Sequence, residues 1–147
     1  MTAINILLID DSAADAVLTA HAFDATGTEP TLRVIAEGEA ALEWLGSDER
    51  ATADPLPDLI LLDLNLPRLS GHQVLDRLKA DPGLRQIPVV VLSSSDDPSD
   101  VAAAYAAHAN SYITKPHNLT DYVAMARAID DFWLTLAALP EPGTRIS

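Results

Sequence analysis

The sequence lacks cysteine and is poor in basic residues, and each shortage narrows what the chain can do. Without cysteine no disulfide can form, which suits a reducing compartment. Nine Lys and Arg stand against 22 Asp and Glu, giving a formal net charge of −13. Such a field would repel a phosphate backbone, and no run of basic residues offsets it. We therefore expect no direct binding to nucleic acid.

Long apolar runs are also absent. No stretch approaches the roughly 18 apolar residues of a membrane span, and no basic segment precedes the first apolar run as it would in a signal peptide. We expect a cytoplasmic protein with no membrane association. The 147 residues are 48% hydrophobic, enough for one sizeable core. The sequence predicts one domain over residues 1–139 and a polar tail over 140–147.

Strand and helix patterns alternate along the chain. Short apolar runs predict strands over residues 4–10, 31–36, 59–63, 88–93 and 111–114. Between and after them, the spacing predicts a helix capped by Ser12 and ended at Thr26-Gly27, with Ala14, Val17, Leu18 and Ala22 on its buried face, and further helices over 39–45, 71–80, 98–108 and 119–139. This alternation predicts an α/β flavodoxin-like (βα)5 fold: a doubly wound parallel sheet, strand order 2-1-3-4-5, with an extended C-terminal helix.

Charged residues follow several of the predicted strands. Asp10 and Asp11 come after the first apolar run, Asp63 after the third and Lys115 after the fifth. In the expected strand order these ends meet at one edge of the sheet, where open α/β sheets bind ligands. Two carboxylates about 4 Å apart repel by roughly 4 kcal/mol at an effective dielectric near 20, so the cluster needs a cation. The available ligand atoms are all oxygens, which favours Mg²⁺ as this cation, and the lysine would supply further positive charge.

These motifs resemble the receiver domain of two-component response regulators, over residues 4 to about 130. The resemblance rests on five motifs in order: Asp10-Asp11 in Leu7-Leu8-Ile9-Asp10-Asp11-Ser12, Asp63 in Leu61-Leu62-Asp63-Leu64-Asn65, Ser93 after Val89-Val90-Val91-Leu92, Tyr112 in Ser111-Tyr112-Ile113-Thr114, and Lys115-Pro116.

The resemblance implies a phosphoaccepting signalling protein, not an ordinary enzyme. Asp63 would take a phosphoryl group from a phosphohistidine of a partner histidine kinase, and water would later hydrolyse the phosphoaspartate. Mg²⁺ would be bound by Asp10, Asp63 and the backbone carbonyl of Asn65, and through water by Asp11. Lys115 and Ser93 would contact phosphoryl oxygens, and Ser93 with Tyr112 would form the switch.

Two further expectations come from the same resemblance. The Lys115-Pro116 bond is expected to be cis. The stretch 105–116 and the long last helix are similar to single-domain receivers that are paired with bacterial phytochrome histidine kinases. We expect signalling through a changed surface, without an attached output domain.

The last helix also predicts a homodimer. Its apolar residues spread over roughly 200° of the helix, whereas docking on a core needs little more than 100°. Phe132, Trp133 and Leu136 lie beyond the usual end of the receiver fold, and a symmetric pairing of two such helices would bury them. The alternative is that this extension folds back on its own domain.

Three other classes of protein are alternatives to an active receiver. An aspartyl-nucleophile, Mg²⁺-dependent phosphatase would need an Asp-x-Asp motif after the first strand, which Asp10-Asp11-Ser12 lacks. An FMN binder would need a Ser/Thr/Gly loop for the phosphate, which Asp10 and Asp11 would repel. A degenerate receiver that acts as a scaffold stays open, and phosphorylation by acetyl phosphate would separate it from an active receiver.

Overall fold

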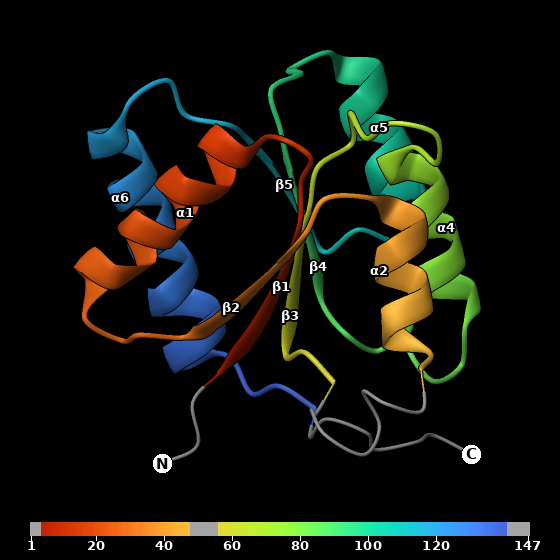
Figure 1. Ribbon diagram of the computed structural model, residues 1–147, viewed down its shortest axis with the longest axis horizontal. Coiled ribbons are helices and arrows are strands. Elements are labelled where there is room, and N and C mark those ends of the chain that lie inside the picture. Colours follow the sequence, from red (N-terminus) through yellow and green to blue (C-terminus); the bar gives the residue numbers. More distant parts are fainter. Residues whose placement is uncertain (1–3, 48–55, 141–147) are drawn as a thin grey trace.

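The computed structural model describes residues 4–47 and 56–140, in which strands alternate with helices (Figure 1). The strands are β1 Asn5–Ile9, β2 Thr31–Ile35, β3 Leu59–Leu62, β4 Val89–Ser93 and β5 Ser111–Thr114. The helices are α1 Ala13–Thr26, α2 Gly38–Leu45, α4 Gly71–Ala80, α5 Pro98–Ala106, α6 Leu119–Ile129 and the π-helix η1 Asp130–Leu136.

The strands form one parallel sheet in the order β2-β1-β3-β4-β5, which confirms the predicted fold. Every residue of β3 and β4 is buried, whereas β2 at the edge is largely exposed. Asp10 and Asp63 fall just outside their strands. The charged residues therefore begin where the buried, hydrogen-bonded strands end.

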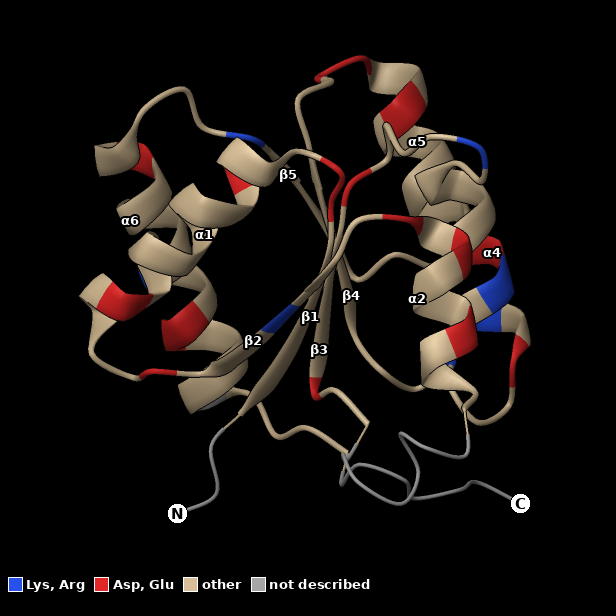
Figure 2. Cartoon of the chain, in the orientation of Figure 1, with Lys and Arg blue, Asp and Glu red and all other residues tan. Residues whose placement is uncertain are grey.

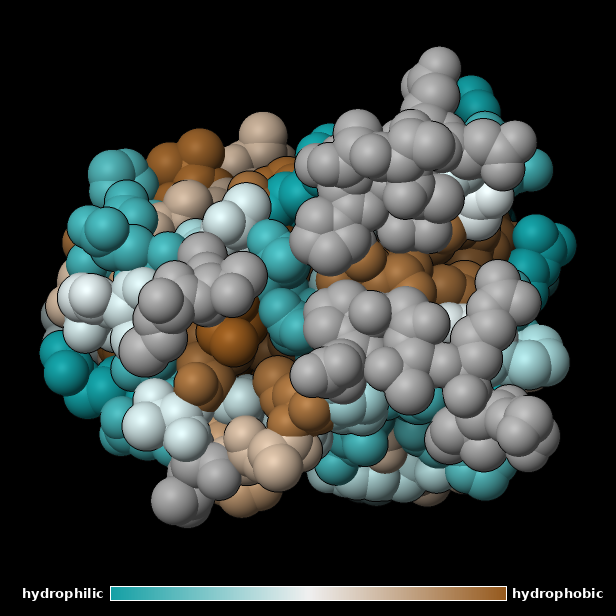
Figure 3. Space-filling model, turned by 90° about the horizontal axis from the view of Figure 1, so that it is seen from below, coloured by the Kyte–Doolittle hydropathy of each residue, from teal (hydrophilic) through white to brown (hydrophobic). Residues whose placement is uncertain are grey.

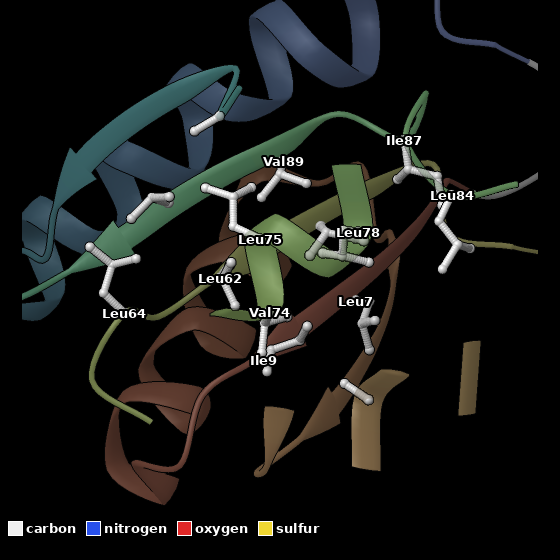
Figure 4. Packing of buried hydrophobic residues seen from close by; sticks show 14 of the residues in the cluster. Leu7, Ile9, Leu62, Leu64, Val74, Leu75, Leu78, Leu84, Ile87 and Val89 are labelled. Atoms are coloured by element: carbon white, nitrogen blue, oxygen red, sulfur yellow. The ribbon is translucent and has the colours of Figure 1, made fainter. Parts of the chain in front are cut away.

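Helices cover both faces of the sheet. In Figure 1, α1 and α6 lie on one side and α2, α4 and α5 on the other. Alternate residues of β1 serve the two layers: Leu7 and Ile9 belong to one hydrophobic cluster, and Ile6 and Leu8 to the other. Figure 4 shows the first cluster, in which side chains of α4 such as Leu75 pack against the strands.

The face of α1 that is buried differs from the sequence prediction. Ser12 caps the helix by accepting a hydrogen bond from the Asp15 amide at 3.2 Å, and Gly27 ends it with φ of 82°, both as expected. The buried face, however, consists of Ala16, Thr19, Ala22 and Phe23. The prediction was wrong for Ala14 and Val17, which are exposed, because the large Phe23 ring takes the core-facing position.

The last helix also departs from the expected single helix over 119–139. It is α-helical to Ile129 and continues as a π-helix, in which the Ala137 amide donates to the Phe132 carbonyl at 2.6 Å. Trp133 and Leu134 are partly buried against the chain's own core, so at these residues the extension folds back on its own domain, the alternative given above. Phe132 is 52% exposed, and the side chain of Leu136 lies outside what the structure describes.

None of the helices in the described residues combines the length and the apolar character needed to cross a bilayer.

Gly71 at the start of α4 predicts a stability effect. Its amide donates to the Leu64 carbonyl at 3.0 Å, and an added Cβ would collide with the backbone of Asp63 and Leu64. We expect Gly71→Ala to destabilise the protein by about 1–3 kcal/mol, because the helix must move off the end of β3. Urea unfolding followed by circular dichroism measures this.

Gly46→Ala is the matched control, since its nearest neighbouring atom would be 3.7 Å away. It should change the unfolding free energy by no more than about 0.5 kcal/mol. Equal stabilities for the two variants would contradict the close approach at Gly71.

Candidate functional site

The candidate site lies at the edge of the sheet where β1, β3 and β5 end. Figure 2 shows acidic residues in the loops after β1 and β3 and a basic residue after β5. Backbone hydrogen bonds fix these ends: the Asp63 amide donates to the Ile9 carbonyl at 2.9 Å, and the Lys115 amide donates to the Ser93 carbonyl at 2.7 Å. The sheet register therefore brings together residues that are far apart in the sequence.

One ammonium group is shared by three carboxylates. The Nζ of Lys115 lies 2.8 Å from Asp15 Oδ2, 2.9 Å from Asp10 Oδ2 and 3.0 Å from Asp63 Oδ2. Asp10, Asp63 and Lys115 are all buried. A buried charge without such partners would be strongly destabilising, so each of these groups depends on the others.

Burial and ion pairing oppose each other in the pKa values. Burial alone would lower the pKa of Lys115, but hydrogen bonds from its ammonium to Asp15, Asp10 and Asp63 more than compensate, and the pKa lies above its usual value. The ammonium therefore stays charged at physiological pH. Burial raises the pKa of Asp10, and the Ser12 amide and Lys115 only partly offset this.

The raised pKa of Asp10 has a consequence for stability. Between its unfolded and folded pKa values, the folded state binds more protons than the unfolded state, so stability from this group is lost as the pH rises through that window. At neutral pH the charged Asp10 therefore costs stability. A carboxylate kept charged at such a cost is typical of a functional site.

Three carboxylates of the site suit a hard divalent cation. Ligand oxygens of Asp10, Asp11 and Asp63 all lie within 4.8 Å of one another. Asp10 Oδ2 is buried and contacts Lys115 Nζ at 2.9 Å, which leaves a further lone pair of this oxygen for an ion. Asp11 is exposed, and a cation there could keep water ligands. The residues present fit Mg²⁺ or a similar ion.

Both oxygens of the Asp63 carboxylate accept a hydrogen bond. Its Oδ1 accepts from the Asn65 amide at 3.1 Å, and its Oδ2 accepts from Lys115 Nζ at 3.0 Å. Asn65 itself is exposed and lies in the loop after β3. The side chain of Asp63 therefore has one orientation, which favours it as a nucleophile or as a ligand.

Ser93 and Tyr112 meet through a third residue. Ser93, which is fully buried, accepts at Oγ from the Ser95 amide at 3.3 Å. The half-buried Tyr112 donates from its hydroxyl to the Ser95 carbonyl at 2.7 Å. Ser95 therefore joins the end of β4 to the ring of Tyr112 on β5.

Two features of the site differ from the sequence prediction. The described residues contain no cis peptide bond, so the expected cis bond at Lys115-Pro116 was wrong. With this bond trans, Lys115 still reaches all three carboxylates. Asp15 was missed altogether, although its place one turn after Ser12 puts it at the same edge of the sheet.

The residues predicted for dimerisation lie elsewhere. Phe132 and Trp133 belong to η1, which follows the end of α6 remote from the site (Figure 1). Their rings meet edge to face, with centroids 5.1 Å apart. They form a separate surface and take no part in the charged cluster.

The chain is similar to known proteins over nearly its whole length. Residues 6–127 match the response regulator receiver domain. Response regulator Rcp1 of Synechocystis is 42% identical, over 92% of each chain. The crystal structure of Mn(2+)-bound Rcp1 superposes with a TM-score of 0.83 at 41% identity, over 92% of this chain and 97% of the other.

A second solved structure is similarly close. The phosphorylated cyanobacterial phytochrome response regulator RcpA has a TM-score of 0.88 at 40% identity, and the match covers 95% of this chain and all of the other. The match to the receiver domain spans most of the chain and includes Asp10, Asp63 and Lys115. The chain therefore belongs to the response regulator receiver domain family.

Proposed function

We propose that Asp63 accepts a phosphoryl group from a phosphohistidine of a partner histidine kinase. The observation that carries this proposal is the shared ammonium of Lys115, which lies within 3.0 Å of Asp63 and of two other carboxylates. Asp63 is buried, yet it stands just after β3 at the open edge of the sheet. It is thus a positioned carboxylate with a cation beside it.

The transfer itself requires few groups. An Asp63 oxygen attacks phosphorus, a P–O bond forms, and the P–N bond to the donor imidazole breaks with its electron pair returning to nitrogen. Lys115 turns from Asp63 Oδ2 to a phosphoryl oxygen, and the Ser93 hydroxyl donates to another. Later attack by water on the phosphoaspartate would end the signal.

A divalent cation completes the charge balance. Mg²⁺ held by Asp10, Asp63 and the Asn65 carbonyl, and through water by Asp11, would neutralise the developing charge on the transferring group. The structure of Rcp1 with Mn(2+) supports a divalent ion in a similar protein. Without the ion, Lys115 is the only cationic side chain within the described residues that pairs with Asp10 and Asp63.

The switch follows from the contacts of Ser95. When Ser93 turns its hydroxyl to a phosphoryl oxygen, the bond from the Ser95 amide is weakened. The Ser95 carbonyl also holds the Tyr112 hydroxyl, so a shift of this loop releases the ring. We propose that the surface around α5 and β5 changes in this way and is read by partner proteins.

The partner kinase is proposed to be a phytochrome-type histidine kinase. RcpA is a phytochrome response regulator by its description, and this chain is 40% identical to it over 95% of its length. We propose that residues 1–139 act together as the receiver unit, with 140–147 as a tail. Residues 1–3, 48–55 and 141–147 lie outside the described part of the chain.

A homodimer through η1 is the last part of the proposal. Phe132 exposes 52% of its surface while its ring rests on the edge of Trp133, so a second copy could cover both rings. Figure 3 shows apolar side chains gathered at the end of the molecule opposite the charged site. We propose that Phe132, Trp133 and Leu136 form this interface.

Asp63→Asn should abolish phosphorylation and leave the fold intact. The amide has the same shape, and it removes one of the carboxylates that repel each other around Lys115. Intact mass after incubation with acetyl phosphate and Mg²⁺ should show one added phosphoryl group for wild type and none for the variant. Asp96→Asn, exposed on the loop after β4, is the control and should behave as wild type.

A variant at Asp63 that gains phosphate like wild type would refute the phosphoacceptor assignment. A wild-type protein that gains none, while Mg²⁺ binds, would instead support the degenerate scaffold.

Transfer from a phytochrome-type kinase should be faster than from an unrelated histidine kinase. A preference of at least about tenfold is expected, since this needs only about 1.4 kcal/mol of differential binding. Initial rates of loss of label from each purified phosphorylated kinase measure it. Equal rates would remove the phytochrome pairing from the proposal.

Phe132→Glu should convert a dimer into a monomer at micromolar concentration. Burying a charge against a second copy should weaken association by about 2 kcal/mol or more. Sedimentation velocity measures the change, with Val34→Glu as the control, because Val34 is 44% exposed on β2. A monomeric wild type, or a dimeric Phe132→Glu variant, would overturn the interface.

A further inference from the structure

Asp15 stands at the charged site without belonging to the predicted metal ligands. It is in the first turn of α1, where its amide donates to Ser12 Oγ at 3.2 Å. Its Oδ2 accepts from Lys115 Nζ at 2.8 Å, the shortest of the three contacts of this ammonium. Its side chain is 30% exposed, whereas those of Asp10 and Asp63 are 1% and 5% exposed.

The three carboxylates that contact Lys115 differ in whether they could bind a divalent ion. Asp10 and Asp63 have oxygens in the group that could hold an ion, together with Asp11, and Asp15 is not in that group. A divalent ion and the ammonium therefore compete for Asp10 and Asp63. Asp15 can keep its contact with Lys115 while the other two change partners.

We propose that Asp15 is a positioning residue of the phosphoacceptor site, which holds Lys115 beside Asp63 and offsets its charge when a divalent ion binds. This inference rests on the proposed function. Without Asp15, the ammonium would be shared by Asp10 and Asp63 alone, and it would compete more strongly with the ion. The ion would bind more weakly, and Lys115 would be less well placed for a phosphoryl oxygen.

Asp15 also faces the other helix of its layer. Burial raises the pKa of Tyr122 on α6, and the nearby Asp15 carboxylate raises it further. Tyr122 is buried in the hydrophobic cluster that α1 and α6 share, and these two helices lie on the same face of the sheet (Figure 1).

A simpler role is open to an acidic residue in a first helical turn. Such a carboxylate stabilises the helix by facing its positive N-terminal end. In that case replacing Asp15 would change stability, but it would not change the affinity for an ion. The two roles therefore predict different results for ion binding.

The test compares Asp15→Asn with Asp24→Asn, which removes the same charge from the exposed last turn of α1. Titration calorimetry with Mg²⁺ alone should show about fivefold weaker binding for Asp15→Asn, from a charge pair partly screened by solvent. Asp24→Asn should stay within about twofold, because its charge lies beyond effective range. Equal affinities for the two variants would overturn the proposal.

A double-mutant cycle separates the role of Lys115 from a general charge effect. In a Lys115→Met background, the loss of affinity from Asp15→Asn should shrink to less than about twofold, since no ammonium remains to be held. An undiminished loss would refute positioning through Lys115. Asp15→Glu keeps the charge and should therefore recover most of the affinity for Mg²⁺. This variant keeps the test decisive if Asp15→Asn folds poorly.

Phosphorylation at saturating Mg²⁺ is the second readout. Asp15→Asn should react with acetyl phosphate about tenfold more slowly than Asp24→Asn, because the ammonium has lost its fixed position. Failure of the proposed function would be distinct: wild type would then bind Mg²⁺ with the expected dependence on Asp15 but would accept no phosphoryl group. A normal rate in Asp15→Asn, with wild type active, would count against positioning.

Discussion

The sharing of one buried ammonium among three carboxylates is the interaction on which this site depends. Lys115 lies within 3.0 Å of Asp10, Asp15 and Asp63, and the three negative charges could not stand so close together without it. One positive charge does not balance three negative ones. The remaining negative charge suits the cluster to a divalent cation, while burial raises the pKa of Asp10. The same buried charges that cost stability thus suit the site to an ion and, under the proposed function, to a phosphoryl group.

The sheet makes this arrangement possible, because its register fixes where each charged residue begins. The Asp63 amide binds the Ile9 carbonyl and the Lys115 amide binds the Ser93 carbonyl, so backbone hydrogen bonds fix the ends of β1 and β3 and the ends of β4 and β5 against each other. The two apolar layers on either side leave no freedom for these strands to slide, since a shift by one residue would exchange Leu7 and Leu8 between the clusters. Close contact of Gly71 with the backbone after β3 confines that loop further.

The fold could be predicted from the sequence because its signals are local and strong. Apolar runs such as Leu59–Leu62 identify buried strands, and their alternation with helices leaves few topologies. The gathering of Asp10, Asp63 and Lys115 followed from strand order alone. The predictions that were wrong depend on side-chain packing, which no local sequence pattern reports. They concern the buried face of α1, where Phe23 packs on the core, and the trans bond before Pro116. They also concern the π-helical turn that places Trp133 on the core. Asp15 was missed for a related reason, since its partner Lys115 is 100 residues away in the sequence.

Two routes lead away from the site, and they run on opposite faces of the sheet. Ser93 and Tyr112 both bind Ser95, so under the proposed function a change at the end of β4 would pass to β5 and α5. Lys115 also contacts Asp15 on α1, and the Asp15 carboxylate raises the pKa of the buried Tyr122 on α6. A receiver needs only the first route to alter one surface. The second route would let the same phosphoryl group influence the helix that continues into η1, where Phe132 is exposed. If η1 is the surface through which two copies meet, phosphorylation and assembly would be linked by a contact on α1, and by reciprocity assembly would in turn change how tightly the site holds its ion.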